Sequence, residues 1–200
     1  MRLLVITGSH RKDGNCFALS KAVLNSLDCD YSIIQLANRE IMYCTICEEC
    51  VTKDCVINDD LYDVLKEMHE SDGIIFVVPK YLSVPSKFMA FLERLASIVH
   101  MRKHNGYEGP PVNPDYTLFN EGKPFCIFAL SGRGNFGEQH INTIVDYAEY
   151  LGMDLVPSDH TPLVAVDVKA GDVKGEVLGN KVAIKQCREL VQKLMTSSRN

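Results

Sequence analysis

The sequence contains no apolar run long enough to cross a membrane or to serve as a signal peptide. It also lacks internal repeats, low-complexity tracts and linkers rich in glycine and serine. Positive charge is not in excess, since the formal net charge is -5, and neither a nucleic acid nor a membrane surface is expected as a partner. We therefore expect a cytoplasmic protein. We also expect a single domain over residues 1–200, because 200 residues suffice for a sizeable core.

Several common catalytic signatures are missing as well. The nucleophile elbow G-x-S-x-G and the metalloprotease motif H-E-x-x-H do not occur, which argues against hydrolases. A G-x-G-x-x-G pattern does occur at Gly132, Gly134 and Gly137, but it follows the fourth predicted strand. A dinucleotide fingerprint normally occupies the first strand-to-helix turn. We interpret these glycines either as backbone that passes close to a ligand or as simple loop flexibility.

The sequence does contain a regular alternation of strand-like and helix-like segments. Strands are predicted at 3–6, 31–36, 73–78, 125–130 and near 155–156, and helices from about 16, 59, 86 and 141 and over 175–194. This order predicts an α/β flavodoxin-like three-layer sandwich with a five-stranded parallel sheet in the order 2-1-3-4-5. Ligands of such sheets bind at the carboxyl ends of the strands, here after Thr7, Val78 and Leu130.

The first of these loops has the composition of an anion site. A buried strand, Leu3 to Ile6, leads into small and basic residues, and a helical pattern starts at Cys16. Backbone N–H groups and the helix dipole would point at this loop, where Ser9 and Arg11 add donors. A phosphate is the expected ligand; an ordinary polar loop capped by Asn15 is the alternative.

The second loop, Pro79 to Lys87, is long and amphipathic. A flat aromatic ligand needs an apolar wall and backbone donors at its polar edge, and Tyr81 and the turn could supply both. Lys80 either faces such a ligand or is simply solvated.

These two loops carry a resemblance. Gly8-Ser9-His10-Arg11 with Gly14-Asn15 is similar to the GSxRxxGN-[ST] loop of NAD(P)H-dependent FMN reductases, and Pro79–Arg94, PKYLSVPSKFMAFLER, resembles their P-x-Y-x-x-x-[PS]-x-x-K-x-F-[IL]-D-R signature. Cys16, Lys80 and Glu93 depart from the family pattern. The resemblance implies FMN contacts at Ser9, His10, Arg11, Gly14, Asn15 and Cys16, at Pro79, Lys80, Tyr81, Leu82 and Ser83, and at Ser131, Gly132, Arg133 and Gly134. Arg94, paired with Glu93 or another neighbour, is expected to be structural.

Four of the eight cysteines fall in one predicted loop over residues 38–58. Cys44, Cys47, Cys50 and Cys55 form C-x2-C-x2-C-x4-C, which is similar to the compact motif of iron–sulfur flavoproteins and indicates a [4Fe–4S] cluster. Zinc and free thiols are the alternatives. The remaining cysteines are expected to be small buried hydrophobes; they are Cys16, Cys29, Cys126 and Cys187.

A second long loop is predicted at 101–122, where glycine and proline break the pattern. Because members of the resembled family are dimers or tetramers, we expect a homodimer or homotetramer in which this loop helps complete a neighbour's flavin site. A basic patch at its start, His100, Arg102, Lys103 and His104, could meet a nicotinamide phosphate or an acidic protein, or be a solvated face.

Three functions remain open on these observations. The first is an FMN-dependent oxidoreductase whose [4Fe–4S] cluster passes electrons to or from FMN, with a ferredoxin-like donor and a small-molecule acceptor. The second is a cluster-free reductase of flavins or quinones that uses NAD(P)H as a substrate. The third is a redox carrier or thiol sensor without turnover. No residue is predicted to act as a general acid or base.

Overall fold

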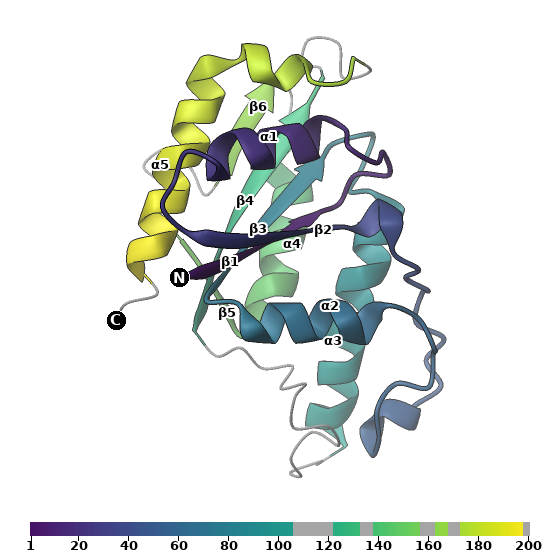
Figure 1. The fold of residues 1–200 in the computed structure, drawn as a ribbon. Helices are drawn as coiled ribbons and strands as arrows, with labels where there is room; N and C mark the ends of the chain where they lie inside the picture. Colours follow the sequence, from purple (N-terminus) through teal and green to yellow (C-terminus); the bar gives the residue numbers. More distant parts are fainter. Residues whose placement is uncertain (106–121, 133–137, 157–162, 168–172, 198–200) are drawn as a thin grey trace.

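The computed structural model describes residues 1–105, 122–132, 138–156, 163–167 and 173–197. A parallel sheet forms the middle layer and helices cover both of its faces (Figure 1). The strands are β1 (Arg2–Thr7), β2 (Asp30–Gln35), β3 (Gly73–Pro79), β4 (Lys123–Ser131), β5 (Met153–Leu155) and β6 (Leu163–Asp167). The helices are α1 (Asn15–Leu24), α2 (Leu61–Glu70), α3 (Ser86–His104), α4 (Glu138–Tyr150) and α5 (Lys181–Ser197).

The sheet order β2-β1-β3-β4-β5 confirms the predicted fold class. β1 pairs with both β2 and β3, and β3 pairs with β4, all in parallel. The sequence shows why: the central strands are continuous apolar runs, as expected of strands buried on both faces. Every residue of β3 except Pro79 is buried.

One edge of the sheet differs from the prediction. β5 pairs with the first residues of β4, Lys123 to Phe125, and β6 pairs with its remainder, Ile127 to Ser131. Two short strands therefore share the fifth position, and the sequence analysis predicted only one of them. The sequence analysis predicted no strand over Leu163–Asp167, because a short apolar segment alone does not distinguish a strand from other buried structure.

The final helix also begins later than predicted. Residues Glu176–Gly179 form a 3₁₀ turn, η4, and α5 starts only at Lys181. Asn180 separates the two, because its Oδ1 accepts a hydrogen bond from the backbone N–H of Ala183 at 3.0 Å. This is an N-cap contact, and it fixes the start of α5.

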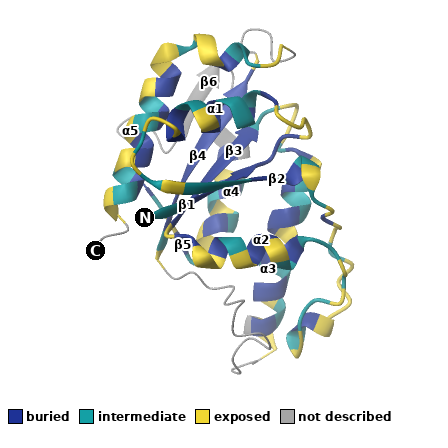
Figure 2. Cartoon of the chain, viewed as in Figure 1, coloured by how far each residue is buried: buried dark blue, intermediate teal, exposed yellow. Residues whose placement is uncertain are grey.

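Alternation along the strands divides the core into two halves. Leu4 and Ile6 of β1 pack with α2, α3 and α4, whereas Leu3 and Val5 pack with α1 and α5. The buried residues accordingly line the strands and the inner faces of the helices (Figure 2). Three of the cysteines outside the loop, Cys16, Cys126 and Cys187, are buried as predicted. Cys29 is only partly buried, so its assignment as a buried hydrophobe was wrong.

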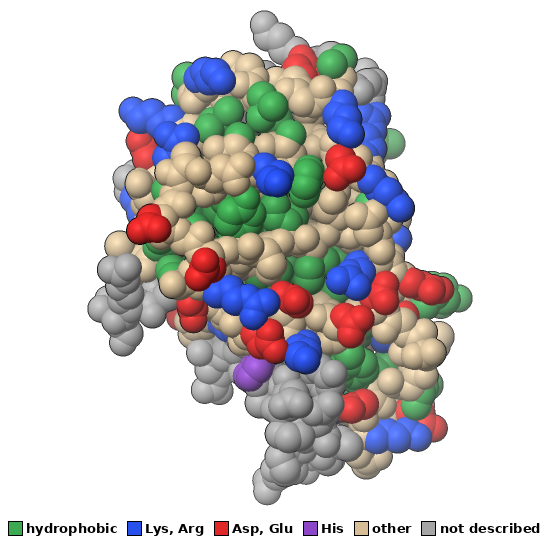
Figure 3. All heavy atoms as spheres, in the orientation of Figure 1, with side chains coloured by type: hydrophobic (Ala, Val, Ile, Leu, Met, Phe, Trp, Pro, Cys, Tyr) green, Lys and Arg blue, Asp and Glu red, His purple; other side chains and the backbone are tan. Residues whose placement is uncertain are grey.

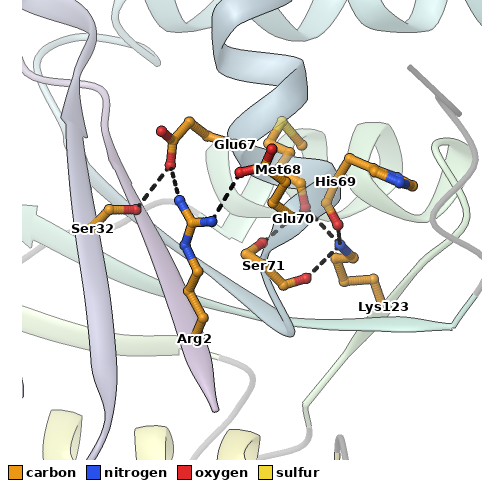
Figure 4. Close-up of polar contacts among 8 residues, drawn as sticks. All are labelled: Arg2, Ser32, Glu67, Met68, His69, Glu70, Ser71 and Lys123. Atoms are coloured by element: carbon orange, nitrogen blue, oxygen red, sulfur yellow. Dashed lines mark hydrogen bonds and ion pairs between the residues drawn. The ribbon is translucent and has the colours of Figure 1, made fainter. Parts of the chain in front are cut away.

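The carboxyl end of α2 is held by a lysine from β4 (Figure 4). Nζ of Lys123 donates hydrogen bonds at 2.6, 2.9 and 2.6 Å to the carbonyl oxygens of Met68, His69 and Ser71. A cation suits this end of a helix, where carbonyl groups lack partners. Burial lowers the pKa of Lys123 to about 8, and the neighbouring Asp72 acts in the opposite direction. These contacts fix α2 against the sheet, and its other end leads back into the cysteine loop.

Among the described residues, none of the helices is both long and apolar enough for a membrane span.

Candidate functional site

Three strand ends converge at the carboxyl edge of the sheet, as the sequence predicted. Thr7 is paired with Val77, and Pro79 is paired with Leu130, so β1, β3 and β4 end side by side. The ladder continues by one residue into the loops, because the N–H of Gly8 donates to Val77 O at 3.0 Å and that of Lys80 to Leu130 O at 2.7 Å. The loops that follow β1 and β3 therefore start in direct contact with neighbouring strands.

The loop after β1 is tightly folded against the core. A Cβ atom at Gly8 would lie 3.0 Å from the ring of Phe88, which is tighter than nine in ten real Cβ contacts. Ser9 is buried, and its Oγ accepts a hydrogen bond from the N–H of Arg11 at 3.1 Å. At Gly14, a Cβ atom would lie 3.2 Å from Cβ of Arg11. Glycine at position 8 thus lets the loop pass close to Phe88, and glycine at position 14 lets it fold back beside Arg11.

The same loop leads into a helix start without a side-chain cap. Gly14 is the N-cap of α1, no side chain bonds to the cap, and no acidic residue lies in the first turn. Asp13, with a φ of 51°, points toward β2, where Gln35 bonds to its backbone N–H at 2.8 Å and to its Oδ1 at 3.2 Å. The first N–H groups of α1 and the positive end of its dipole are therefore suited to an anionic group.

Two predicted contact residues have further roles here. Asn15 donates from Nδ2 to Val173 O at 3.0 Å and accepts at Oδ1 from the N–H of Val177 at 3.5 Å. It therefore ties the segment before α5 to the start of α1. Cys16 is buried, and burial raises the pKa of its thiol to about 12. Its side chain therefore belongs to the core.

The second loop approaches the first through a ring contact. The rings of His10 and Tyr81 are stacked, with centroids 6.1 Å apart and an angle of 13° between their planes. Tyr81 is 49% exposed and Leu82 is 96% exposed, although both are large apolar side chains. The turn is closed by a bond of 3.3 Å from the N–H of Tyr81 to Ser83 O. An exposed aromatic and aliphatic pair at a strand end is typical of a ligand-binding edge.

The third predicted loop is only partly described. Ser131 ends β4 and is buried, and Gly132 is exposed. Arg133 and Gly134 lie outside the described residues.

All four cysteines of the second predicted site line one cavity. Cys44, Cys47, Cys50 and Cys55 share it with Arg94 and Met101 of α3. Cys50 is buried, and its pKa is raised first by burial and then by the charges of the other three cysteines. One backbone N–H group also points at sulfur, since that of Ile46 lies 3.4 Å from Cys44 Sγ. Within the described part of the chain, no three His, Cys, Asp or Glu side chains are grouped closely enough to hold a metal ion.

The neck of the cysteine loop is closed by two aspartates. Asp59 Oδ2 accepts the N–H of Met42 at 2.8 Å, and Asp60 Oδ2 accepts that of Glu40 at 2.7 Å. Asp59 Oδ1 also accepts the N–H of Leu61, the first residue of α2, at 3.1 Å. The Asp59–Asp60 pair is therefore structural, and it joins the two ends of the loop.

Two buried arginines of α3 bind the loop from the other side. Arg94 pairs with Asp59 at 2.7 Å and donates to Met42 O at 3.0 Å and to Cys55 Sγ at 3.4 Å. Its partner is thus Asp59, and not the adjacent Glu93.

Arg102 donates from Nε to Cys50 O at 3.1 Å and from a terminal nitrogen to Lys53 O at 3.4 Å. Because Arg102 is buried under the loop, the sequence-based interpretation of residues 100–104 as a solvated or partner-binding patch was wrong at this residue. Charge patterns along α3 could not show which arginine the loop would cover.

Comparison with known proteins identifies the family. A model of the NADPH-dependent FMN reductases matches residues 1–164. The chain belongs to this family. It is 28% identical over 202 residues to an iron-sulfur flavoprotein of Methanosarcina thermophila, covering 96% of this chain and 98% of the relative. An iron-sulfur flavoprotein of Archaeoglobus fulgidus is 26% identical over 205 residues, covering 98% and 94%. Family membership confirms the predicted FMN-dependent oxidoreductase.

Solved structures show the same fold at low sequence identity. RosB, with a bound riboflavin phosphate derivative, has a TM-score of 0.68 at 14% identity, covering 100% of this chain and 79% of that one. The NAD(P)H:acceptor oxidoreductase FerB of Paracoccus denitrificans has a TM-score of 0.57 at 12% identity, covering 98% of both chains. NADH:FMN oxidoreductase EmoB has a TM-score of 0.56 at 15% identity, covering 100% and 91%.

The buried ion pair predicts a large stability effect. Asp59→Ala leaves the Arg94 guanidinium buried without its counterion, so the free energy of unfolding should fall by about 3–5 kcal/mol, as measured by urea unfolding. Asp63→Ala is the matched control: Asp63 is 70% exposed, and its pair with Arg39 is 4.0 Å long. It should change stability by less than about 0.5 kcal/mol. Equal losses in the two variants would contradict this account of the neck.

Proposed function

We propose that the chain binds FMN across the loops after β1, β3 and β4 and exchanges electrons between FMN and a [4Fe–4S] cluster on the cysteine loop. The observation that carries the FMN part is the meeting of two loops. The loop after β1 leads into the uncapped start of α1, and the loop after β3 carries the exposed Tyr81. The ring contact between His10 and Tyr81 joins these two loops. One loop offers donors for a phosphate and the other offers a flat apolar surface, which are the two needs of FMN.

The phosphate end is proposed to rest on the first loop. Ser9, Arg11 and the first N–H groups of α1, including that of Cys16, would donate to phosphate oxygens. Asn15 already bonds to Val173 and Val177 through one amide hydrogen and its oxygen, so at most its second amide hydrogen remains for the phosphate. Gly14 keeps the approach open, since a Cβ atom there would fill the space beside Arg11.

The ring end is proposed to rest on the second and third loops. Tyr81 and Leu82 would cover the apolar part of the ring, and backbone groups of Pro79 to Ser83, with Ser131 and Gly132, would face its polar edge. Bound FMN supplies hydride or single-electron chemistry, while the protein orients the ring and keeps water from it. Lys80, beside this edge, would favour the anionic reduced ring.

The cysteine site is proposed to hold the cluster through Cys44, Cys47, Cys50 and Cys55. The shared cavity supports this, as do the N–H of Ile46 aimed at Cys44 Sγ and the iron-sulfur flavoprotein relatives. Ligation would draw the four thiols closer than they stand here. Zinc fits less well, because structural zinc more often uses two separated C-x2-C knuckles. The electron donor is proposed to be NADPH or a ferredoxin-like protein, and the acceptor a small molecule.

The phosphate proposal predicts a ligand-dependent effect of Arg11. Arg11→Met should weaken FMN binding at least about tenfold, because a charge-assisted hydrogen bond is lost, and should leave riboflavin binding unchanged. Fluorescence titration of the flavin measures both affinities. Lys21→Met, at the far end of α1, removes the same charge and serves as the control. If riboflavin lost affinity to the same extent, the phosphate would not be the group that Arg11 binds.

The cluster proposal predicts the absorbance spectrum of the chain purified without oxygen. Two flavin bands should be accompanied by a broad shoulder that bleaches on reduction, with iron and acid-labile sulfide present. Cys47→Ser should remove the shoulder and keep the flavin bands. Cys29→Ser, outside the loop, should change neither. Flavin without iron or sulfide, together with NADPH oxidation, would favour the cluster-free reductase instead.

We also propose that the chain assembles as a homodimer or homotetramer. Apolar side chains of the cysteine loop are exposed; they are Met42, Tyr43, Ile46 and Val56. Figure 3 shows hydrophobic side chains along this edge of the molecule, at the lower right. A groove of about 750 Å³ runs beside them and is lined by Ile46, Met101, Tyr147 and Tyr150 among others. A second copy could cover this surface. Residues 101–104 of the predicted loop at 101–122 belong to α3, so α3 extends further than the sequence analysis expected, and residues 106–121 lie outside the described residues.

Assembly through this groove predicts a charge-sensitive oligomer. Tyr150→Glu should shift the sedimentation coefficient toward that of a monomer, because it replaces an aromatic ring by a negative charge in a groove that Glu93 and Asp146 also line. Val182→Glu on α5 is also an exposed apolar position and should leave the assembly intact. A monomeric wild-type protein would overturn the proposal.

A further inference from the structure

Arg94 is the largest of the fully buried side chains, and its charge needs an explanation. It lies within α3, is 1% exposed, and pairs with Asp59, whose side chain is fully buried. Removing two charges from water costs free energy, and apolar side chains of similar volume often serve stability as well or better. Packing alone therefore does not explain why the chain carries the buried Arg94–Asp59 pair.

The guanidinium joins the neck of the cysteine loop to one sulfur. One terminal nitrogen, Nη1, bonds to Met42 O and to Asp59, and the other, Nη2, points at Cys55 Sγ at 3.4 Å. The planar fork of arginine holds these directions together, which a lysine could not do. The N–H of Cys55 is held as well, by Tyr62 Oη at 2.6 Å. Both the position of this residue and the direction of a donor toward its sulfur are thus fixed.

Hydrogen bonds to ligand sulfurs, together with net charge, set the reduction potential of iron–sulfur centres. The reduced centre carries more negative charge, so a donor aimed at a ligand sulfur stabilises it more than the oxidised centre. Asp59 does not cancel this effect completely, because its two oxygens also accept N–H groups of Met42 and Leu61. A cationic donor at Cys55 should therefore raise the potential.

We propose that Arg94 is a positioning residue that raises the reduction potential of the metal centre through its hydrogen bond to Cys55 Sγ. This inference rests on the proposed cluster. From the sequence we expected Arg94 to be purely structural. The inference instead gives this residue control over electron transfer between the cluster and FMN.

α3 offers a matched control for this role. Arg102 lies eight residues after Arg94, about two helical turns on, and is buried under the same loop. It donates to the carbonyl oxygens of Cys50 and Lys53 and pairs with Asp54 at 3.7 Å. Arg94→Lys and Arg102→Lys keep the charge and disturb the same loop, and only the first removes the fork aimed at Cys55 Sγ. A purely structural effect would move both variants alike.

The test is a potentiometric titration of the complete protein, purified without oxygen, with the cluster followed by electron paramagnetic resonance and FMN by absorbance. Arg94→Lys should disfavour reduction of the cluster about tenfold, a fall of about 59 mV for a one-electron couple. The cluster potential of Arg102→Lys and the FMN potential of both variants should stay at the wild-type values.

A second variant covers the case in which Arg94→Lys does not fold. The double variant Arg94→Met with Asp59→Asn removes both charges together, so neither is left buried alone, and it should show the same fall in potential. Equal cluster potentials in wild type, Arg94→Lys and the double variant would overturn the role of Arg94, although the proposed cluster itself would still be supported. Wild-type protein with FMN but without iron and sulfide would overturn the cluster, and the role of Arg94 with it.

Discussion

Parallel pairing of β1 with β3 and of β3 with β4 is the constraint on which the candidate site depends. Parallel strands bring their carboxyl ends to one edge, and here the ladder runs on into the loops through the N–H groups of Gly8 and Lys80. Residues about 70 positions apart in the sequence, such as His10 and Tyr81, can then touch. The loops themselves need little internal structure, because the sheet has already placed their starting points.

The cysteine loop depends on a different kind of constraint. It lies between β2 and α2, and its four thiols are brought to one cavity by polar contacts at its neck and from α3. Asp59 alone joins the start of the loop, the start of α2 and Arg94. This makes the geometry around the thiols a property of the folded domain, and it links the position of α3 to that of Cys55. The same helix begins directly after the loop that carries Tyr81, so α3 contacts both candidate sites.

Much of this architecture could be predicted from the sequence. Continuous apolar runs identified β1, β3 and β4, the segment 31–36 was predicted as the strand that became β2, and loop motifs indicated the residues around Ser9 and Tyr81. The rest depends on contacts between distant segments. The short apolar segment of β6 alone does not identify a strand, and Asn15 bonds to Val173 and Val177, which no local pattern links to it. The sequence around Arg102 is typical of a charged surface, and only the fold shows that the cysteine loop covers this residue. Local patterns identify elements and motifs, whereas the burial of a charge is decided by what packs over it.

The close approach of Gly8 to Phe88 couples the loop after β1 to the first turn of α3. Because a Cβ atom at position 8 would lie 3.0 Å from the ring of Phe88, neither position can change freely. A larger residue at position 8 requires the ring at position 88 to move by a few tenths of an ångström, and a smaller side chain at position 88 removes that requirement. The two positions should therefore covary among relatives, and an alanine at position 8 should be tolerated far better beside a leucine or valine than beside the native phenylalanine.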